Sequence, residues 1–400
     1  MHYAQIMRLK NQIKSNMKQI LGAAALCLVA VGCTNQKDRT SQLASGLDPQ
    51  SFDREFRGEK TALYTLKNAS GMEVDITNYG GRVVSLMVPD RDGKLQDVVL
   101  GFDSVAAYFP EINQSDFGAS VGRYANRINQ GRFVLDGDTV KLPQNNFGHC
   151  LHGGTDMGTL GWQYRVYNAQ QPNDTTLVLT INDADGNNGF PGTVNATVTY
   201  KLLSDNTLDI SYEATTDKPT VVNMTNHSYF NLSGDPAKSI TDHVLTVNAP
   251  SYTPVDSTFM TTGEIAVVEG TPFDFTQPKE IGRDIDQPGN EQVKFANGYD
   301  HNWVLGTNGD DKVVAATLYS PASGISMDMF TSEPGVQIYT GNFLDGTQTG
   351  KRGVVYNKRA GVCLETQHYP DSPNKPEWPT TTLRPGEKYS SHTAYRFSVK

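Results

Sequence analysis

Short segments rich in β-branched and aromatic residues dominate this chain from about Phe56 to its C-terminus. Clusters of Gly, Asn, Asp and Pro separate these segments, as at 185–189 and 204–206. Helical periodicity is scarce, and only 105–112 indicates a short helical turn. Strands that do not alternate with helices favour an antiparallel arrangement, so the pattern predicts an all-β fold built as a large antiparallel β-sandwich. The segments that carry the prediction are 177–181, 197–200, 208–212, 244–247 and 315–319.

Length and charge limit the possible classes of function. With 400 residues, 37% of them hydrophobic, the chain can bury a large core. No repeat or second domain boundary is visible, so a single β domain over 51–400 is predicted. The formal net charge is −9, and a chain this acidic is not expected to bind nucleic acid. A neutral small molecule is the more suitable ligand.

The N-terminal segment has the layout of a secretory signal. A basic stretch ends at Lys18, and an apolar run over 20–31 is too short to span a bilayer. Small residues then precede Cys33, as at a bacterial lipoprotein cleavage site, although Ala30 stands where such sites usually carry Leu. The segment 1–32 is therefore predicted to be a lipoprotein signal peptide. The alternative is a signal peptide without lipid, and Met17 is a second possible start.

Cleavage before Cys33 predicts an exported, lipid-anchored protein on the periplasmic side or the cell surface. Losing residues 1–32, which carry four basic residues and no acid, would change the net charge from −9 to −13. The polar, aperiodic stretch 33–50 is predicted to be a flexible tether.

The cysteines do not indicate a metal centre. Cys27 would leave with the signal and Cys33 would carry the lipid, so Cys150 and Cys363 remain in the domain. These two could pair in an oxidising compartment, but their spacing does not require it. No CxxC or His/Cys grouping is typical of a metal site, and no phosphate-binding loop or nucleophile elbow is present.

Six motifs, spread from about residue 60 to the C-terminus, resemble those of the aldose 1-epimerase (galactose mutarotase) family. Each motif alone is weak evidence, and the resemblance rests on finding all six in the same order as in the family. They are 78–82 with 99–102, Gly122-Arg123-Tyr124-Ala125-Asn126-Arg127-Ile128 with Leu151-His152-Gly153-Gly154, 223–232 around His227, Tyr299-Asp300-His301-Asn302-Trp303, 333–342 around Gln337, and 364–371 around Glu365.

The resemblance implies a many-stranded β-supersandwich that interconverts the α and β anomers of free hexoses such as glucose and galactose, without a cofactor. Ring opening needs one group that removes the proton of the C1 hydroxyl and another that protonates the ring oxygen. Carboxylates and imidazoles suit these roles. By resemblance, Glu365 is the base and His227 is the acid.

The remaining site residues are also implied by the resemblance. His152 is a second imidazole near C1 or the ring oxygen. Asn126 and Arg127 donate hydrogen bonds to sugar hydroxyls, Asp300 accepts them from two neighbouring hydroxyls, and Gln337 positions the C1 side.

Structural roles are the alternatives for these residues. His227 could be a hydrogen-bonded histidine at a strand end, and Glu365 could face solvent from a strand. However, the apolar stretch before Glu365 and Tyr369-Pro370 after it favour a buried acid of raised pKa. Among the aromatic residues, core packing is expected for Trp162 and Trp303, and Phe275 is a candidate pocket wall.

Three other functions are consistent with parts of the sequence. A non-catalytic sugar-binding lipoprotein would lack one of the acid–base residues, and none is missing. A relative acting on sugar phosphates would need a cationic pocket. A glycoside hydrolase would need two carboxylates at the scissile bond, which Asp300 and Glu365 could supply.

Overall fold

The computed structural model describes residues 43–113, 115–155 and 158–400, and Leu43–Lys400 form one compact unit. The predicted signal peptide, Cys33 and the first part of the predicted tether lie outside the described residues. The last part of that tether, 43–50, is not flexible linker but belongs to the fold. Ala44 N–H donates to Glu73 Oε1 at 2.7 Å and Ser45 Oγ to Asp75 Oδ2 at 2.6 Å. The domain therefore includes 43–50 as well as the predicted 51–400.

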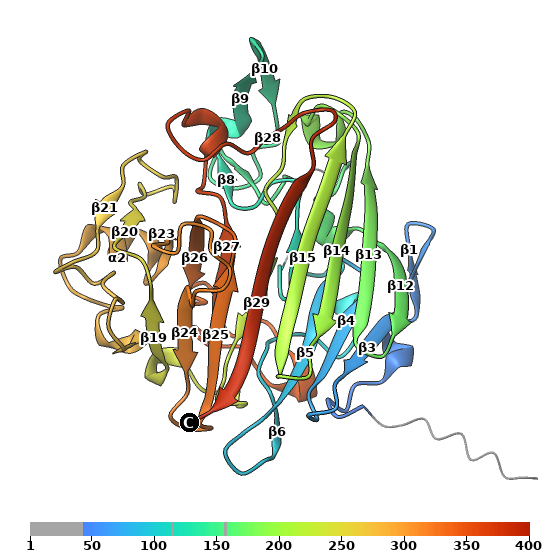
Figure 1. The fold of residues 1–400 in the computed structure, drawn as a ribbon, viewed down its shortest axis with the longest axis vertical. Coiled ribbons are helices and arrows are strands. Elements are labelled where there is room, and N and C mark those ends of the chain that lie inside the picture. The colour runs from blue at the N-terminus through green and yellow to red at the C-terminus, as the bar shows by residue number, and fades with distance from the viewer. Residues whose placement is uncertain (1–42, 114, 156–157) are drawn as a thin grey trace, which may run out of the picture. The chain divides into compact units, whose positions relative to one another are not determined.

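A nine-stranded antiparallel sheet runs across the molecule, from β12 at one edge to β19 and β22 at the other (Figure 1). Its long central strands alternate buried and exposed residues, so one face is covered and the other faces solvent. In spatial order the strands are β12 (Asn168–Asn173), β13 (Thr176–Asp183), β14 (Val194–Leu202), β15 (Thr207–Thr216), β29 (Tyr389–Val399), β25 (Ile325–Thr331), β24 (Ala316–Tyr319), β19 (Val244–Val247) and β22 (Lys279–Glu280).

Two smaller antiparallel sheets contribute to the same buried core. The six-stranded sheet has the order β18 (Tyr229–Phe230), β27 (Val362–Gln367), β26 (Gly335–Tyr339), β23 (Asp300–Val304), β20 (Ser251–Thr253) and β21 (Ala266–Val267). The four-stranded sheet has the order β3 (Leu63–Lys67), β4 (Glu73–Thr77), β5 (Arg82–Pro89) and β6 (Leu95–Asp97).

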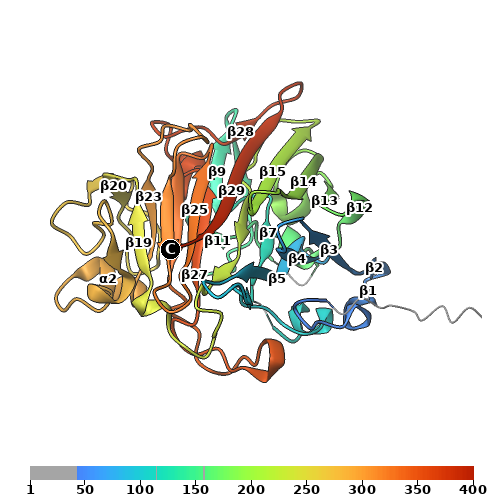
Figure 2. The ribbon, with the colours of Figure 1, turned by 60° about the horizontal axis from the view of Figure 1, so that its bottom comes forward.

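One hydrophobic core unites the three sheets. It combines Ile76 of the four-stranded sheet and Leu364 of the six-stranded sheet with Leu179 and Met327 of the nine-stranded sheet. Burying this much apolar surface is the main force that holds the layers together. The predicted all-β antiparallel sandwich is confirmed. Figure 2 shows the same layers from a direction turned by 60°.

Short elements complete the fold. Five strand pairs lie outside the large sheets: β1 (Arg54–Phe56) with β2 (Glu59–Thr61), β7 (Ala119–Val121) with β17 (Thr225–His227), β8 (Arg127–Ile128) with β11 (Cys150–Leu151), β9 (Arg132–Leu135) with β10 (Asp138–Lys141), and β16 (Thr220–Val221) with β28 (Thr382–Leu383). The 3₁₀ turns are η1 (Pro49–Phe52), η2 (Val105–Tyr108), η3 (Asn129–Gly131), η4 (Trp162–Tyr164), η5 (Asn187–Gly189), η6 (Ile240–Asp242), η7 (Ile281–Arg283), η8 (Lys351–Gly353) and η9 (Ser372–Asn374).

Helical structure is sparse among the described residues, as predicted. The turn expected within 105–112 is η2, whereas the α-helix α2 (Glu291–Ala296) was not predicted. Its start is fixed by Asn290, whose side chain accepts a hydrogen bond from Val293 N–H. Within the described residues, no helix has the length and apolarity needed to cross a membrane.

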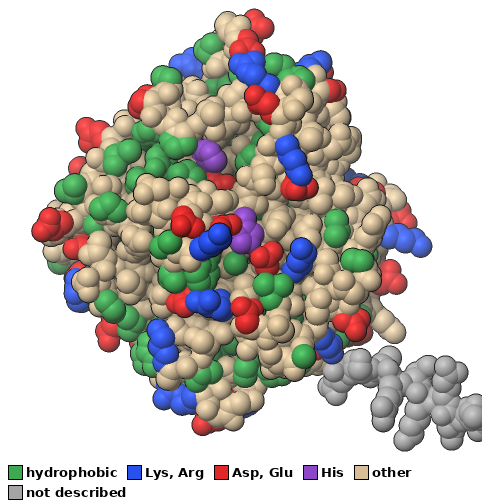
Figure 3. Space-filling view, in the orientation of Figure 1, with side chains coloured by type: hydrophobic (Ala, Val, Ile, Leu, Met, Phe, Trp, Pro, Cys, Tyr) green, Lys and Arg blue, Asp and Glu red, His purple; other side chains and the backbone are tan. Residues whose placement is uncertain are grey.

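The positions of charged, aromatic and cysteine side chains test several expectations from the sequence. Lys and Arg side chains are scattered among acidic ones on the face shown in Figure 3. Trp162 and Trp303 are 1% and 0% exposed and belong to the core, as expected. Phe275 also lies in that core and not at the pocket, so its assignment as a pocket wall is wrong. Cys150 and Cys363 are both free, buried thiols.

Candidate functional site

The site lies on one face of the six-stranded sheet, because side chains alternate along its strands. On β27, Leu364 joins the hydrophobic core, whereas Cys363 and Glu365 point to the opposite face. The register places Gln337 of β26 directly beside Glu365. Asp300 of β23 pairs with Tyr339 of β26 in the same way and therefore lies on the same face. The pleat thus gathers polar side chains from three strands above an apolar layer.

A cavity of about 330 Å³ opens on this face, within the range of small-molecule sites. The predicted residues Asn126, Arg127, His152, His227, Asp300 and Glu365 all line it. Gln337 does not line the cavity but contacts it through Asp300. The other lining residues are Asp116, Asn146, Phe147, Leu151, Tyr229, Phe259, Tyr339 and Phe343.

His227 and Glu365 lie next to each other in the cavity lining, although they are far apart in sequence. The distance from His227 Nε2 to Glu365 Oε1 is 3.5 Å, and both side chains are almost completely buried. Glu365 Oε2 is buried without a hydrogen-bond partner among the described residues. Buried polar atoms rarely stay unpaired, so this oxygen is suited to accept a hydrogen bond from a ligand.

Burial shifts both members of this pair toward their neutral forms. It raises the pKa of Glu365 well above its ordinary value, and the nearby carboxylates of Asp300 and Asp116 add to that rise. Burial lowers the pKa of His227 to about 4. The two groups therefore favour a state in which they hold one proton between them.

Neighbouring side chains fix the His227 ring. Tyr229 stacks on it with a centroid separation of 5.1 Å, and Cys363 Sγ lies 3.4 Å from its Nδ1. Burial raises the pKa of the Cys363 thiol well above its usual value, so the sulfur stays protonated and can act as a weak acceptor for an Nδ1–H proton. In that arrangement Nε2 of the neutral ring is unprotonated and can take the proton that it shares with Glu365.

The backbone sets the tautomer of His152. Its Nδ1 accepts a hydrogen bond from Asn126 N–H at 3.2 Å, so Nε2 carries the proton of the neutral ring. Burial lowers the pKa of His152 well below the ordinary value, and His227 and Arg127 lower it further. His152 is therefore a neutral hydrogen-bond donor, with its ring centroid 5.3 Å from that of His227.

Two groups of side chains lie close enough together to be considered as metal ligands. One consists of Asp116, His152 and His227, and the other of His227, Cys363 and Glu365. A ligating imidazole donates its second N–H to an acceptor, whereas His152 Nδ1 receives a hydrogen bond from a donor. The first group therefore does not suit a cation in this tautomer. In the second group, the raised pKa of Cys363 opposes formation of a ligating thiolate.

Arg127 and Asp300 present complementary charges to the cavity. Arg127 Nε and Nη2 donate to Asn146 Oδ1, and its guanidinium lies 5.1 Å from the Phe259 ring centroid. Gln337 Nε2 donates to Asp300 Oδ1 at 2.7 Å. These contacts fix one edge of each charged group and leave the rest for a polyhydroxylated ligand.

Exposed aromatic rings surround the mouth of the cavity. Phe147 and Phe343 are 63% and 56% exposed, and Phe259 packs against both. Tyr339 stacks on Phe343 at 6.4 Å. This aromatic rim, not Phe275, supplies the apolar surface on which sugar C–H groups can pack.

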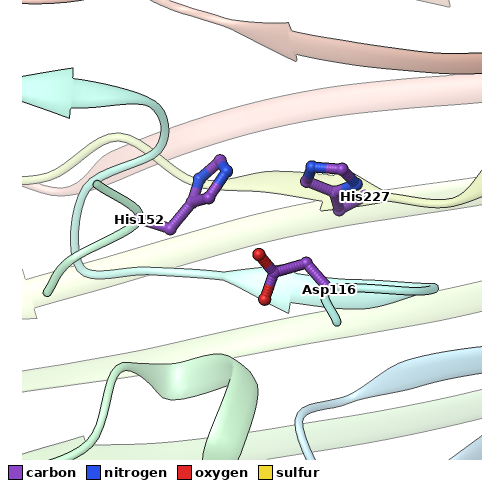
Figure 4. A group of neighbouring side chains, drawn as sticks. All are labelled: Asp116, His152 and His227. Atoms are coloured by element: carbon purple, nitrogen blue, oxygen red, sulfur yellow. The ribbon is translucent and has the colours of Figure 1, made fainter. Parts of the chain in front are cut away.

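Sequence reasoning missed Asp116, Tyr229 and Tyr339 as cavity residues, and it missed Cys363 as a contact of the His227 ring. Cys363 lies two residues before Glu365 on β27, so the period of two along a strand could have identified it. Tyr229 lies two residues after His227, but on the next strand, β18. Asp116 carries no such signal, because it lies in a turn before β7 (Figure 4).

Comparison with known proteins places the chain among sugar epimerases. A sequence profile described as aldose 1-epimerase matches residues 62–396. Galactose mutarotase of Mus musculus is 43% identical over 328 residues, which cover 82% of this chain and 92% of that protein. Aldose 1-epimerase of Escherichia coli K12 is 39% identical over 343 residues, 85% of this chain and 96% of that protein. The crystal structure of galactose 1-epimerase from Lactobacillus acidophilus has a TM-score of 0.75 at 29% identity, covering 86% of this chain and 97% of its own.

Proposed function

The chain belongs to the aldose 1-epimerase family, and we propose that it is a mutarotase that interconverts the α and β anomers of free hexoses such as galactose and glucose. The observation that carries this proposal is the His227–Glu365 pair, 3.5 Å apart in a buried cavity. Non-catalytic sugar binding needs hydrogen-bond donors and acceptors, but not a carboxylate and an imidazole that share a proton.

Ring opening follows from the two protonation states of the pair. With the proton on His227, the Glu365 carboxylate removes the proton of the C1 hydroxyl while His227 Nε2–H protonates the ring oxygen. The C1–O5 bond breaks, and the C1 oxygen becomes an aldehyde. Rotation about C1–C2 presents the other carbonyl face. Ring closure then returns the proton from Glu365 to O1 and that of the ring oxygen to His227.

The surrounding residues hold the sugar during this cycle. His152 donates toward the reacting oxygens, and Asp300 and Arg127 bind hydroxyls away from C1. The pair reaches its charged form at a cost because the site is buried, and the hydroxyl dipoles of the bound sugar offset part of that cost.

Activity should extend to more acidic pH than an ordinary histidine would allow. A second proton on the pair removes the base, and this happens only near the His227 pKa of about 4. At alkaline pH, activity should fall when the pair loses its single proton, which the raised pKa of Glu365 delays.

The measurement is the pH profile of kcat by polarimetry, corrected for buffer catalysis, in wild type and in Asp116→Asn. The variant is included because burial raises the pKa of Asp116 to about 6 in the same cavity. An acid limb near the ordinary histidine value in both proteins would contradict the assignment.

Asp300→Asn should raise KM and lower kcat together. The change keeps the shape and the contact with Gln337 but removes the charge that accepts from sugar hydroxyls in the ground state and the transition state. We expect kcat/KM to fall by about 10- to 100-fold. Asp138→Asn, at an exposed position of β10, is the matched control. A change confined to kcat would show that Asp300 acts on the chemical step instead.

The direct test of the function is polarimetry of freshly dissolved α-galactose and α-glucose with purified protein. Rotation should relax to equilibrium faster than in buffer, without added metal or nucleotide. An unchanged rate at micromolar protein would favour the sugar-binding alternative, and release of sugar from a glycoside would favour a hydrolase.

We further propose that the protein is exported and anchored to a membrane through a lipid on Cys33, as the apolar run over 20–31 and the small residues before Cys33 indicate. Metabolic labelling with a fatty acid should mark wild type, and Cys33→Ala should abolish the label and release the protein from the membrane fraction. Wild type without label would rule the anchor out.

A further inference from the structure

Asp116 is a second carboxylate close to the proposed acid, and the mechanism above does not use it. A carboxylate oxygen of Asp116 and one ring nitrogen each of His152 and His227 all lie within 4.8 Å of one another. Figure 4 shows the three side chains. Asp116 also lines the cavity, so its side chain is accessible to a bound sugar.

Several contacts fix Asp116 in this position. The buried Arg82 guanidinium donates to the carbonyls of Ser115 and Phe117, at 3.1 and 2.9 Å, on either side of it. Tyr164 O–H donates to Asp116 Oδ1 at 3.3 Å. Among the described residues, Oδ2 has no donor, which leaves an acceptor for a ligand. The carboxyl is ionised at neutral pH, because burial raises its pKa only to about 6.

Asp116 and Glu365 each lie close to His227 but do not belong to one group of close ligand atoms. Of the two groups of close ligand atoms, one contains Asp116 and the other contains Glu365, and His227 is their common member. If His227 protonates the ring oxygen and Glu365 faces O1, the separation of Asp116 from Glu365 suits a position of Asp116 beside the ring oxygen and away from C1. In an aldopyranose that side is C5, and in a hexose C5 carries the hydroxymethyl group C6.

We propose that Asp116 determines substrate specificity by accepting a hydrogen bond from the C6 hydroxyl of a hexopyranose. This inference rests on the proposed mutarotase function. It predicts that the enzyme favours hexoses with a free C6 hydroxyl over pentoses and 6-deoxyhexoses. Sugars with a C6 carboxylate should be poor substrates, because two anions would face each other in a buried site.

Two sugar pairs isolate the C6 hydroxyl. D-Galactose and D-fucose differ only in that group, and D-xylose is D-glucose without C6. Wild type should favour the hexose by about 10- to 100-fold in kcat/KM, the usual value of a hydrogen bond to a charged acceptor.

Asp116→Ala should remove that preference. Relative to wild type, its kcat/KM for D-galactose should fall about 10-fold or more further than its kcat/KM for D-fucose. Asp116→Asn, which keeps the shape and one acceptor, should show a smaller loss on D-galactose and a gain on D-glucuronate. Tyr164→Phe removes the contact to Oδ1 and should reduce the preference partly. Asp138→Asn is the charge-matched control at an exposed site.

The outcomes separate this inference from the function on which it rests. A loss by the same factor on D-galactose and D-fucose would overturn it and show that Asp116 supports the histidines instead. Equal kcat/KM of wild type for both sugars would also overturn it. Wild type without activity on any of the sugars would overturn the mutarotase function and this inference together.

Discussion

Glu365→Gln should lower kcat for mutarotation by about 10²–10⁴-fold, the usual contribution of a positioned general base. The amide keeps the shape of the carboxyl but cannot take the C1 hydroxyl proton. Binding of the sugar should change much less, because Asp300 and Arg127 still hold its hydroxyls. The measurement is the kcat and KM of wild type and variant by polarimetry, with Glu55→Gln, at an exposed site of β1, as the control.

The same variant should be at least as stable as wild type at neutral pH. An acid whose pKa is higher in the folded state than in the unfolded chain destabilises the fold as pH rises above its unfolded pKa. Glu365 is such an acid, since burial raises its pKa. Removing it should therefore leave the Tm unchanged or raise it. A near-normal kcat would show that the base is misassigned and make His152 the next candidate.

His227→Asn should lower kcat by a similar factor, because no group then protonates the ring oxygen. The amide still donates a hydrogen bond but cannot pass a proton to the sugar and recover it. The double variant with Glu365→Gln should lose far less than the product of the two single losses, because either change already interrupts the proton relay.

The double-variant result distinguishes a proton relay from two independent contacts. Thermal unfolding of each variant checks that Tyr229 and Cys363, which contact the His227 ring, have not repacked. Losses that multiply in the double variant would show that the two residues act independently.

The fold class could be predicted because strand periodicity is a local property of the sequence. The alternation along Val362–Gln367 places Val362 and Leu364 on one face and Glu365 and Gln367 on the other, and the structure shows Val362 and Leu364 in the core. The start of the domain could not be predicted in this way. The stretch 43–50 has no strand periodicity, and it is held in the fold by Leu47 in a hydrophobic cluster and by the buried acids Glu73 and Asp75, which are distant in sequence.

The candidate site could be predicted only in part, because it depends on contacts between residues that are distant in sequence. His227 and Glu365 could be selected from their motifs, but their 3.5 Å separation depends on β17 and β27 meeting in space. Asp116 follows no motif, and its place beside two histidines depends on the pairing of β7 with β17. The aromatic rim combines Phe147, Phe259 and Phe343 from three separate loops, whereas Phe275 was chosen for its local sequence alone.

The most direct test of the mutarotase assignment is magnetisation exchange between the two anomeric protons of galactose at equilibrium. The β-anomer signal is saturated, and the loss of intensity at the α anomer is followed by NMR with and without protein. Wild type should transfer saturation at a rate proportional to its concentration, and Glu365→Gln at the same concentration should not. Transfer in wild type that does not exceed the protein-free rate would contradict the account.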